Sequence, residues 1–122
     1  MTANSDPWPT ELRVSSDKKT LTIAFNNGAN YDLAAEYLRV CSPSAEVKGH
    51  APSQKKTVPG KRNVEIIKVE PVGNYAVRIH FDDMHNTGIY TWRYFLDLGE
   101  RPEQHWDVYL RELHEKGLSR DH

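Results

Sequence analysis

Apolar and polar side chains alternate strictly over residues 74–81. Every second residue from Tyr75 to Phe81 is apolar, and the residues between them are polar or small. Successive side chains of a strand point to opposite faces, so this pattern predicts a β-strand with one face on a core. Leu21, Ile23 and Phe25 repeat the pattern earlier in the chain. These segments indicate a β-rich domain.

Turn signals divide the rest of the chain into further strands. The tripeptides DKK at 17–19 and NNG at 26–28 favour tight turns between antiparallel strands. At 64–70 the apolar residues fall on both faces, which indicates a bulge or a strand that is covered on both sides. The predicted strands cover residues 12–14, 21–25, 29–32, 64–70, 74–81 and 89–92.

Two helices complete the prediction. Asp32 is expected to cap a short helix over 33–39. Trp92, Phe95 and Leu96 follow the last strand at helical spacing. A longer helix is expected to begin near Pro102 and to end at Gly117. Its apolar stripe, which is expected to dock on the sheet, consists of Trp106, Tyr109, Leu110 and Leu113.

We therefore expect an α+β fold: a small twisted, mainly antiparallel sheet of about six strands, with a short helix after the third strand and a C-terminal amphipathic helix. The 122 residues suit one domain. It is expected over residues 11–117, between a flexible N-terminal arm at 1–10 and a C-terminal tail at 118–122.

Charge and cysteine content limit the partners. Lys and Arg number 16 against 17 Asp and Glu, which leaves no global field to attract nucleic acid or an anionic membrane. The chain has no apolar run of membrane-spanning length and no secretory signal at its N-terminus, and its one cysteine suits a reducing compartment. We expect a soluble cytoplasmic protein that binds neither membranes nor nucleic acid.

Residues 41–62 show no periodicity, and such long loops are usually functional or disordered. The stretch between Glu46 and Glu65 contains no acid. Its basic residues are Lys48, Lys55, Lys56, Lys61 and Arg62. Such a stretch is usually just solvated, and it could otherwise bind an acidic partner or a phosphate-bearing ligand.

Six histidines suggest a metal hypothesis. The pattern His-x-Asp, half of the facial triad of non-haem iron oxygenases, occurs at His80 and at His105. On a helix the second pair diverges, whereas His80 and Asp82 share one face of a strand. The candidate ligands for iron or zinc are His50, His80, Asp82, Asp83 and His85. No nucleophile constellation or phosphate-binding glycine loop stands out, and Cys41 shows no histidine partner.

Three ordered blocks together resemble the γ-butyrobetaine hydroxylase N-terminal-like family. They are LRVCSPSAEVKGH at 38–50, PVGNYA at 71–76 and FDDMHNTGIYTW at 81–92. The resemblance covers about residues 9–98 and implies a small α+β domain that stands alone in many bacteria. Related domains lie at the N-terminus of carnitine-pathway dioxygenases and at the C-terminus of some P-loop iron–sulfur carrier proteins.

The chain departs from its metal-binding relatives. In the dioxygenases the resemblance implies a structural zinc held by three cysteines and one histidine. Those positions fall here on Ser42, Ser44 and Val47, with the histidine at His85. Without thiolates a zinc site of that type is expected to be absent. Met84 stands where the family usually has glycine, and it is strained if the turn needs a positive φ.

The resemblance and the residues lead to three functional hypotheses. The first is a non-catalytic binding or adapter module that serves iron–sulfur or other metalloprotein maturation through a protein partner, such as an iron–sulfur carrier. Its binding surface is expected to contain Arg39, Ser42, Ser44, Glu46, His50, Asp82, Asp83 and His85.

The second hypothesis is direct binding of iron or zinc by the histidine and aspartate ligands named above. The third is a small-metabolite enzyme that uses Asp83 and His85 as an acid–base pair. An independent oxygenase is not expected, because its catalytic barrel needs well over a hundred further residues.

Overall fold

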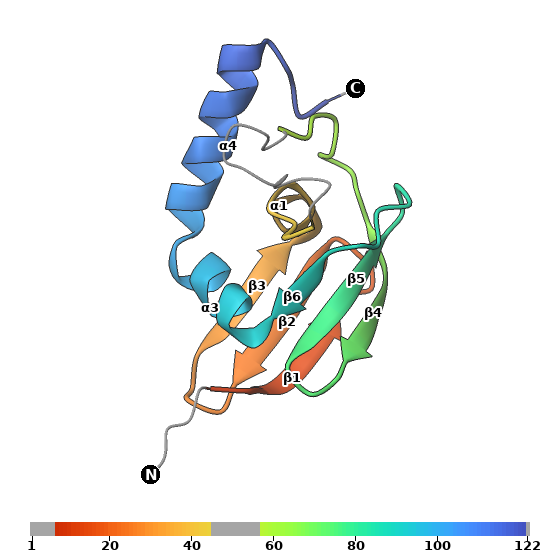
Figure 1. Ribbon diagram of the computed structural model, residues 1–122, viewed down its shortest axis with the longest axis vertical. Helices are drawn as coiled ribbons and strands as arrows, with labels where there is room; N and C mark the ends of the chain where they lie inside the picture. The colour runs from red at the N-terminus through yellow and green to blue at the C-terminus, as the bar shows by residue number, and fades with distance from the viewer. Residues whose placement is uncertain (1–6, 45–56, 122) are drawn as a thin grey trace.

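The computed structural model describes residues 7–44 and 57–121 (Figure 1). Its elements are β1 (Pro9–Val14), β2 (Thr20–Phe25), β3 (Asn30–Ala34), α1 (Ala35–Val40), β4 (Ile66–Val72), β5 (Ala76–Phe81), β6 (Ile89–Thr91), α3 (Trp92–Glu100) and α4 (Pro102–Lys116). The α+β class, the short helix after the third strand and the C-terminal helix are therefore confirmed.

The strands form two antiparallel sheets rather than one. Their orders are β1-β2-β3 and β4-β5-β6, so each sheet is a meander of sequential strands. Figure 1 shows the β4–β6 sheet lying across the β1–β3 sheet, with α3 and α4 along one side. The apolar faces of both sheets meet in a single core. The fully buried residues Leu21, Ile23, Ile66, Ile79, Tyr90, Phe95 and Leu98 are part of it.

The alternating segment 74–81 forms a strand over only part of its length. Val77, Ile79 and Phe81 point into the core as predicted, and Ala76 on the opposite face is buried too. The strand begins at Ala76, and Tyr75 lies in the preceding turn with 54% of its surface exposed. Alternation thus predicted the buried face but placed the start of the strand too early.

The predicted helix cap at Asp32 is wrong. Residues 32–34 continue β3, and α1 starts at Ala35 with no side-chain cap. Asp32 lies directly across from Thr22 in the sheet and accepts a hydrogen bond from its hydroxyl at 2.6 Å. A cross-strand partner therefore competes successfully for the carboxylate that would otherwise cap the helix.

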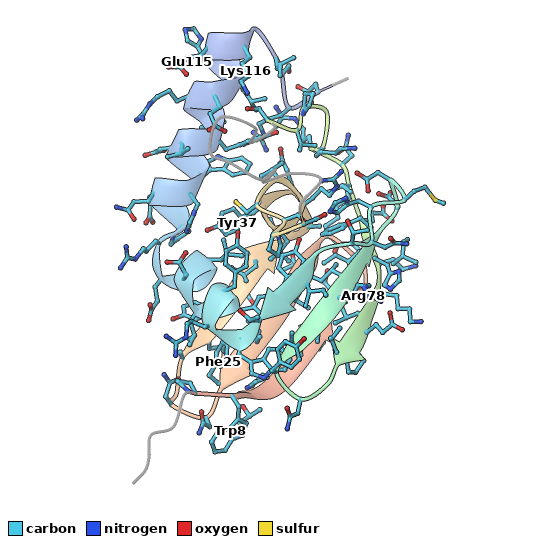
Figure 2. The ribbon with its side chains drawn as sticks, viewed as in Figure 1. Trp8, Phe25, Tyr37, Arg78, Glu115 and Lys116 are labelled. Carbon is cyan, nitrogen blue, oxygen red and sulfur yellow. The ribbon has the colours of Figure 1, made fainter. Side chains whose placement is uncertain are left out.

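The long helix α4 ends as predicted but packs differently. Gly117 closes it in the left-handed conformation with φ 65°. Tyr109 and Leu113 pack against Val40 of α1 rather than against a sheet. Leu110 remains 39% exposed, so it does not belong to the buried stripe. Below the outer end of α4, labelled by Glu115 and Lys116 in Figure 2, Tyr37 lies by α1 and hydrogen-bonds the Leu98 carbonyl.

Both ends of the described chain are tied to the domain. β1 begins at Pro9, inside the segment expected to be an arm. Beyond α4, Arg120 makes two hydrogen bonds of 2.7 Å to Glu36, and the Ser119 carbonyl accepts one from Gly60. Within residues 7–44 and 57–121, no helix is long and apolar enough to cross a bilayer.

Candidate functional site

A group of polar side chains, some buried and some reaching the surface, lies where the end of α1 meets the β5–β6 connection. We call it the polar cluster, and its members are Arg39, Ser42, Ser44, Lys61, Asp83, His85 and Thr87. Four of these side chains, those of Arg39, Ser42, Ser44 and His85, are among the buried polar residues of the protein. Two segments far apart in sequence, 39–44 and 83–87, thus supply most of the cluster.

Local backbone geometry brings these segments together. After β5, Phe81 N–H donates to the His85 carbonyl and Met84 N–H donates to the Phe81 carbonyl, which closes a tight turn. Gly88 then passes so close to α1 that a Cβ atom there would lie 2.5 Å from Ser42 Oγ. Only glycine leaves room for this approach.

Hydroxyl groups and an imidazole form one half of the polar cluster. Ser42 Oγ lies 2.9 Å from His85 Nε2 and accepts a hydrogen bond from Ser44 N–H at 3.2 Å. Ser44 Oγ and Thr87 Oγ1 are hydrogen-bonded at 2.6 Å. Ser42 is fully buried and His85 is only 6% exposed. This half therefore pins the β5–β6 connection to the end of α1.

An ionic group forms the other half. Asp83 Oδ2 lies 2.7 Å from Arg39 Nε and 2.6 Å from Lys61 Nζ, while Oδ1 accepts the His85 backbone N–H at 3.1 Å. Burial acts to raise the pKa of Asp83, but the hydrogen bonds from Lys61, Arg39 and the His85 backbone outweigh it and lower the pKa to about 2. Asp83 is therefore ionised at neutral pH.

Arg39 depends strongly on this carboxylate. Its side chain is buried, and Arg39 Nη1 has no hydrogen-bond partner among the residues that the structure describes. A buried guanidinium without a counterion carries a large desolvation penalty. Asp83 is thus the group that makes burial of Arg39 tolerable.

Met84 stands between the two anchored residues but points the other way. Its backbone has φ 74°, in the left-handed region, and its side chain is 86% exposed. The turn therefore does hold its non-glycine residue at a positive φ, the condition under which Met84 is expected to be strained. From residue 82 to residue 86, neighbouring side chains alternate between exposed and more buried positions.

The four proposed metal ligands that the structure describes, His80, Asp82, Asp83 and His85, do not form a metal-binding group. His80 Nε2 lies 3.0 Å from Glu70 Oε1 on the β4–β5 sheet, and Asp82 Oδ1 accepts the Glu65 backbone N–H. Among residues 7–44 and 57–121, no three His, Cys, Asp or Glu side chains are grouped to hold a metal ion. Glu46, Val47 and His50 lie outside the described residues.

Most of the described residues in the predicted binding surface are buried. Arg39, Ser42, Ser44 and His85 are buried: Ser42 bonds to Ser44 and His85, and Arg39 bonds to Asp83. Of the described residues in that prediction, only Asp82 is classed as exposed. These buried side chains can shape a neighbouring surface without forming it.

Lys61 and Thr87 belong to the polar cluster although sequence reasoning did not assign them to it. In the sequence, Lys61 is one of five basic residues in the acid-free stretch, and Thr87 belongs to the third block. Nothing in the spacing of Lys61 predicts its pairing with Asp83. Thr87, in contrast, lies two residues after His85. In an extended segment this spacing places both side chains on the same face, so the sequence does indicate that Thr87 accompanies His85.

A shallow hollow of about 330 Å³ lies beside Asp83. Its lining residues are Gly60, Lys61, Asn63, Val64, Asp82 and Asp83. Four of these six residues are polar or charged, and the carboxylate of Asp83 is held by its two cationic partners. The hollow is unlike the apolar pocket expected beside an enzymatic base, whose pKa is raised.

The chain matches one protein-family model. The family model described as gamma-butyrobetaine hydroxylase-like, N-terminal, matches residues 12–96. No curated protein matches the chain.

Solved structures share both sequence and fold. Two NMR solution structures are each 44% identical to the chain, with TM-scores of 0.80 and 0.81. They cover 96% and 98% of it, and the chain covers 92% and 90% of theirs. A crystal structure from Acidithiobacillus ferrooxidans is 38% identical, with a TM-score of 0.65, over 78% of this chain and 98% of the other. That protein is described as having unknown function and belonging to the DUF971 family.

Proposed function

The chain belongs to the gamma-butyrobetaine hydroxylase-like N-terminal family, and from this premise we propose that it is a non-catalytic protein-binding module. One observation carries the proposal. Asp83 and His85, the residues best suited to chemistry, bond to other residues of the polar cluster and fix a loop that exposes the apolar side chain of Met84. A fixed loop with an apolar tip suits recognition better than catalysis.

The acid–base alternative is weak on electrostatic grounds. An efficient general base has a pKa near the working pH, whereas the pKa of Asp83 is about 2. Ser42 lies beside His85 in the arrangement of a nucleophile and its base, but it is fully buried. A substrate cannot reach its hydroxyl without separating α1 from the β5–β6 connection.

The partner class comes from the resemblance alone. Family members that accompany iron–sulfur carrier proteins suggest a partner in iron–sulfur or other metalloprotein maturation. In this proposal the module contributes a docking surface, and the metal chemistry belongs to the partner.

Affinity capture with the chain as bait tests the function, with retained proteins quantified by mass spectrometry. We expect the wild type to retain a defined protein, and Asp83→Ala to lose it at a temperature where circular dichroism shows the variant folded. Lys61→Ala removes only one of the two cationic partners of Asp83, so we expect a smaller loss of the retained protein. The matched control is Glu115→Gln, at the exposed outer end of α4 (Figure 2).

Two results would contradict the proposal. One is a wild-type bait that retains nothing beyond the background of an unrelated protein. The other is a purified chain, prepared without a histidine tag, that carries about one equivalent of iron or zinc, since this would favour a metal-binding function.

A further inference from the structure

Two irregularities of the backbone place apolar side chains on the same outer surface. The first is the turn after β5, which holds Met84 in the left-handed region. This conformation costs about 1–2 kcal/mol for a residue with a side chain. It persists because Asp83 and His85, on either side, are anchored in the polar cluster.

The second irregularity is the bulge in β4. Ile66 pairs with Phe81 and Lys68 with His80, so Ile67 is the extra residue without a partner in β5. Bulges re-aim side chains, and the Ile67 side chain is 55% exposed.

Met84 and Ile67 border one hollow of about 360 Å³. We call this surface the Met84 patch, and it is lined by Ile67, His80, Phe81, Asp82, Met84 and Asn86. The hollow is large enough for one or two side chains of another molecule. Methionine adapts to different apolar shapes because its side chain is unbranched and flexible.

Asp82 lines the Met84 patch, and Glu65 is its neighbour through the backbone. The backbones of Glu65 and Asp82 are joined, because Asp82 N–H donates to the Glu65 carbonyl at 2.9 Å. Neither carboxylate forms an ion pair with another side chain in the described parts of the chain. The one cation nearby on β4, Lys68, lies 4.0 Å from Glu70. Asp82 therefore places a negative charge beside Met84.

We propose that the Met84 patch docks a protein segment in which an apolar side chain is flanked by Lys or Arg. This inference rests on the proposed function and specifies where the module binds and what it recognises. The apolar side chain enters the hollow between Met84 and Ile67, while a neighbouring basic residue pairs with Asp82. Such an apolar centre with a charged rim is usual in protein interfaces, and the charges give specificity and faster association.

Selection from a random dodecapeptide library displayed on phage tests the docking site. The wild-type chain is the target, and Met84→Asp is used to remove peptides that bind elsewhere. We expect the selected peptides to share an apolar residue with Lys or Arg nearby. A synthetic copy of the best peptide should shift the amide signals of residues 65–68 and 82–86.

Matched variants then define the contact. Met84→Asp should weaken binding of the synthetic peptide at least about tenfold, and Met84→Ser should weaken it less. Val108→Asp makes the same kind of change at an exposed apolar residue of α4 and should leave the affinity unchanged. Asp82→Asn should lower the affinity a few-fold and reduce its dependence on salt.

The outcomes separate this inference from the proposed function. Peptides that bind the wild type and Met84→Asp equally would contradict docking at the Met84 patch. So would peptides that shift the amide signals around Tyr75 and Trp92 instead. Either result would still be consistent with a protein-binding module. Selection of acidic peptides would contradict the proposal that the partner segment carries Lys or Arg. Selection of no peptide at all would contradict both proposals.

Discussion

His80 and His85 are five residues apart, and their surroundings are opposite. His85 is buried in the polar cluster beside Ser42. His80 belongs to a surface group on the β4–β5 sheet, which we call the Glu70 group: Lys68, Glu70, Arg78 and His80. Figure 2 shows Arg78 pointing away from β5 on that outer face. Similar residue types thus form a structural core in one place and a solvated surface in the other.

Burial explains why the two groups are expected to contribute differently to the stability of the fold. In the Glu70 group water can replace each lost contact, because all four side chains reach solvent. In the polar cluster a lost partner leaves a charge or a hydroxyl buried without compensation. A hydrogen bond of about 3 Å therefore has different consequences at His80 and at His85.

Removal of Asp83 should have the largest effect. Asp83→Ala leaves Arg39 and Lys61 without their shared carboxylate, so we expect the free energy of unfolding to fall by about 3 kcal/mol. Urea denaturation followed by circular dichroism measures it. If the free energy of unfolding fell only as little as it does when an exposed ion pair is removed, the polar cluster would contribute no more to stability than the Glu70 group.

Acid should weaken the polar cluster next. The pKa of Asp83 is about 2 in the folded chain, against 3.8 for an aspartate without these contacts. Its contribution is therefore complete above pH 4 and is lost as the pH falls from 4 to 2. We expect a loss of about 1–2 kcal/mol, since water still screens a side chain that is 17% exposed. Denaturation across this range should show the loss in the wild type but not in Asp83→Asn. Parallel pH profiles of the two would argue against the ionic half of the cluster.

Glycine at position 84 should stabilise the chain. Met84→Gly removes the left-handed strain, although glycine also increases the freedom of the unfolded chain, so a net gain of about 1 kcal/mol is expected. Lys18→Gly is the matched control, because Lys18 has φ 64° in an exposed turn. Thermal denaturation should show similar gains for both variants. Only Met84→Gly should weaken peptide binding, and equal loss by both would contradict the Met84 patch.

The Glu70 group should show the smallest effect. The hydrogen bond from His80, the charge of Lys68 and that of Arg78 lower the pKa of Glu70. Because the group is solvated, Glu70→Gln should leave the urea midpoint within experimental error. A clear shift would show that the outer face of this sheet is more tightly coupled than its exposure suggests.

Local signals in the sequence predicted the fold well where backbone chemistry decides it. Gly117 is left-handed at the end of α4, and the apolar residues at 64–70 correctly indicated a bulge. The predictions failed where tertiary partners compete. Thr22 takes the carboxylate of Asp32 from the helix, and α4 packs on Val40 of α1 rather than on a sheet. Periodicity identifies an apolar face but not the element that covers it.

The candidate site was predictable only in part. The family resemblance brought Ser42, Ser44 and His85 together, and the structure agrees. Their burial could not be read from residue types, since serine and histidine occur both inside and outside proteins. Lys61 was hidden among other basic residues, and only the fold shows that it shares Asp83 with Arg39.

Backbone order in the β5–β6 connection is the most direct test of the claim that the polar cluster holds this loop in place. NMR relaxation gives an order parameter for each amide from 82 to 88. The account predicts values of about 0.85, as in the rigid strands beside the loop, and lower values in Asp83→Ala. Values below about 0.6 in the wild type would show a flexible loop and contradict the claim.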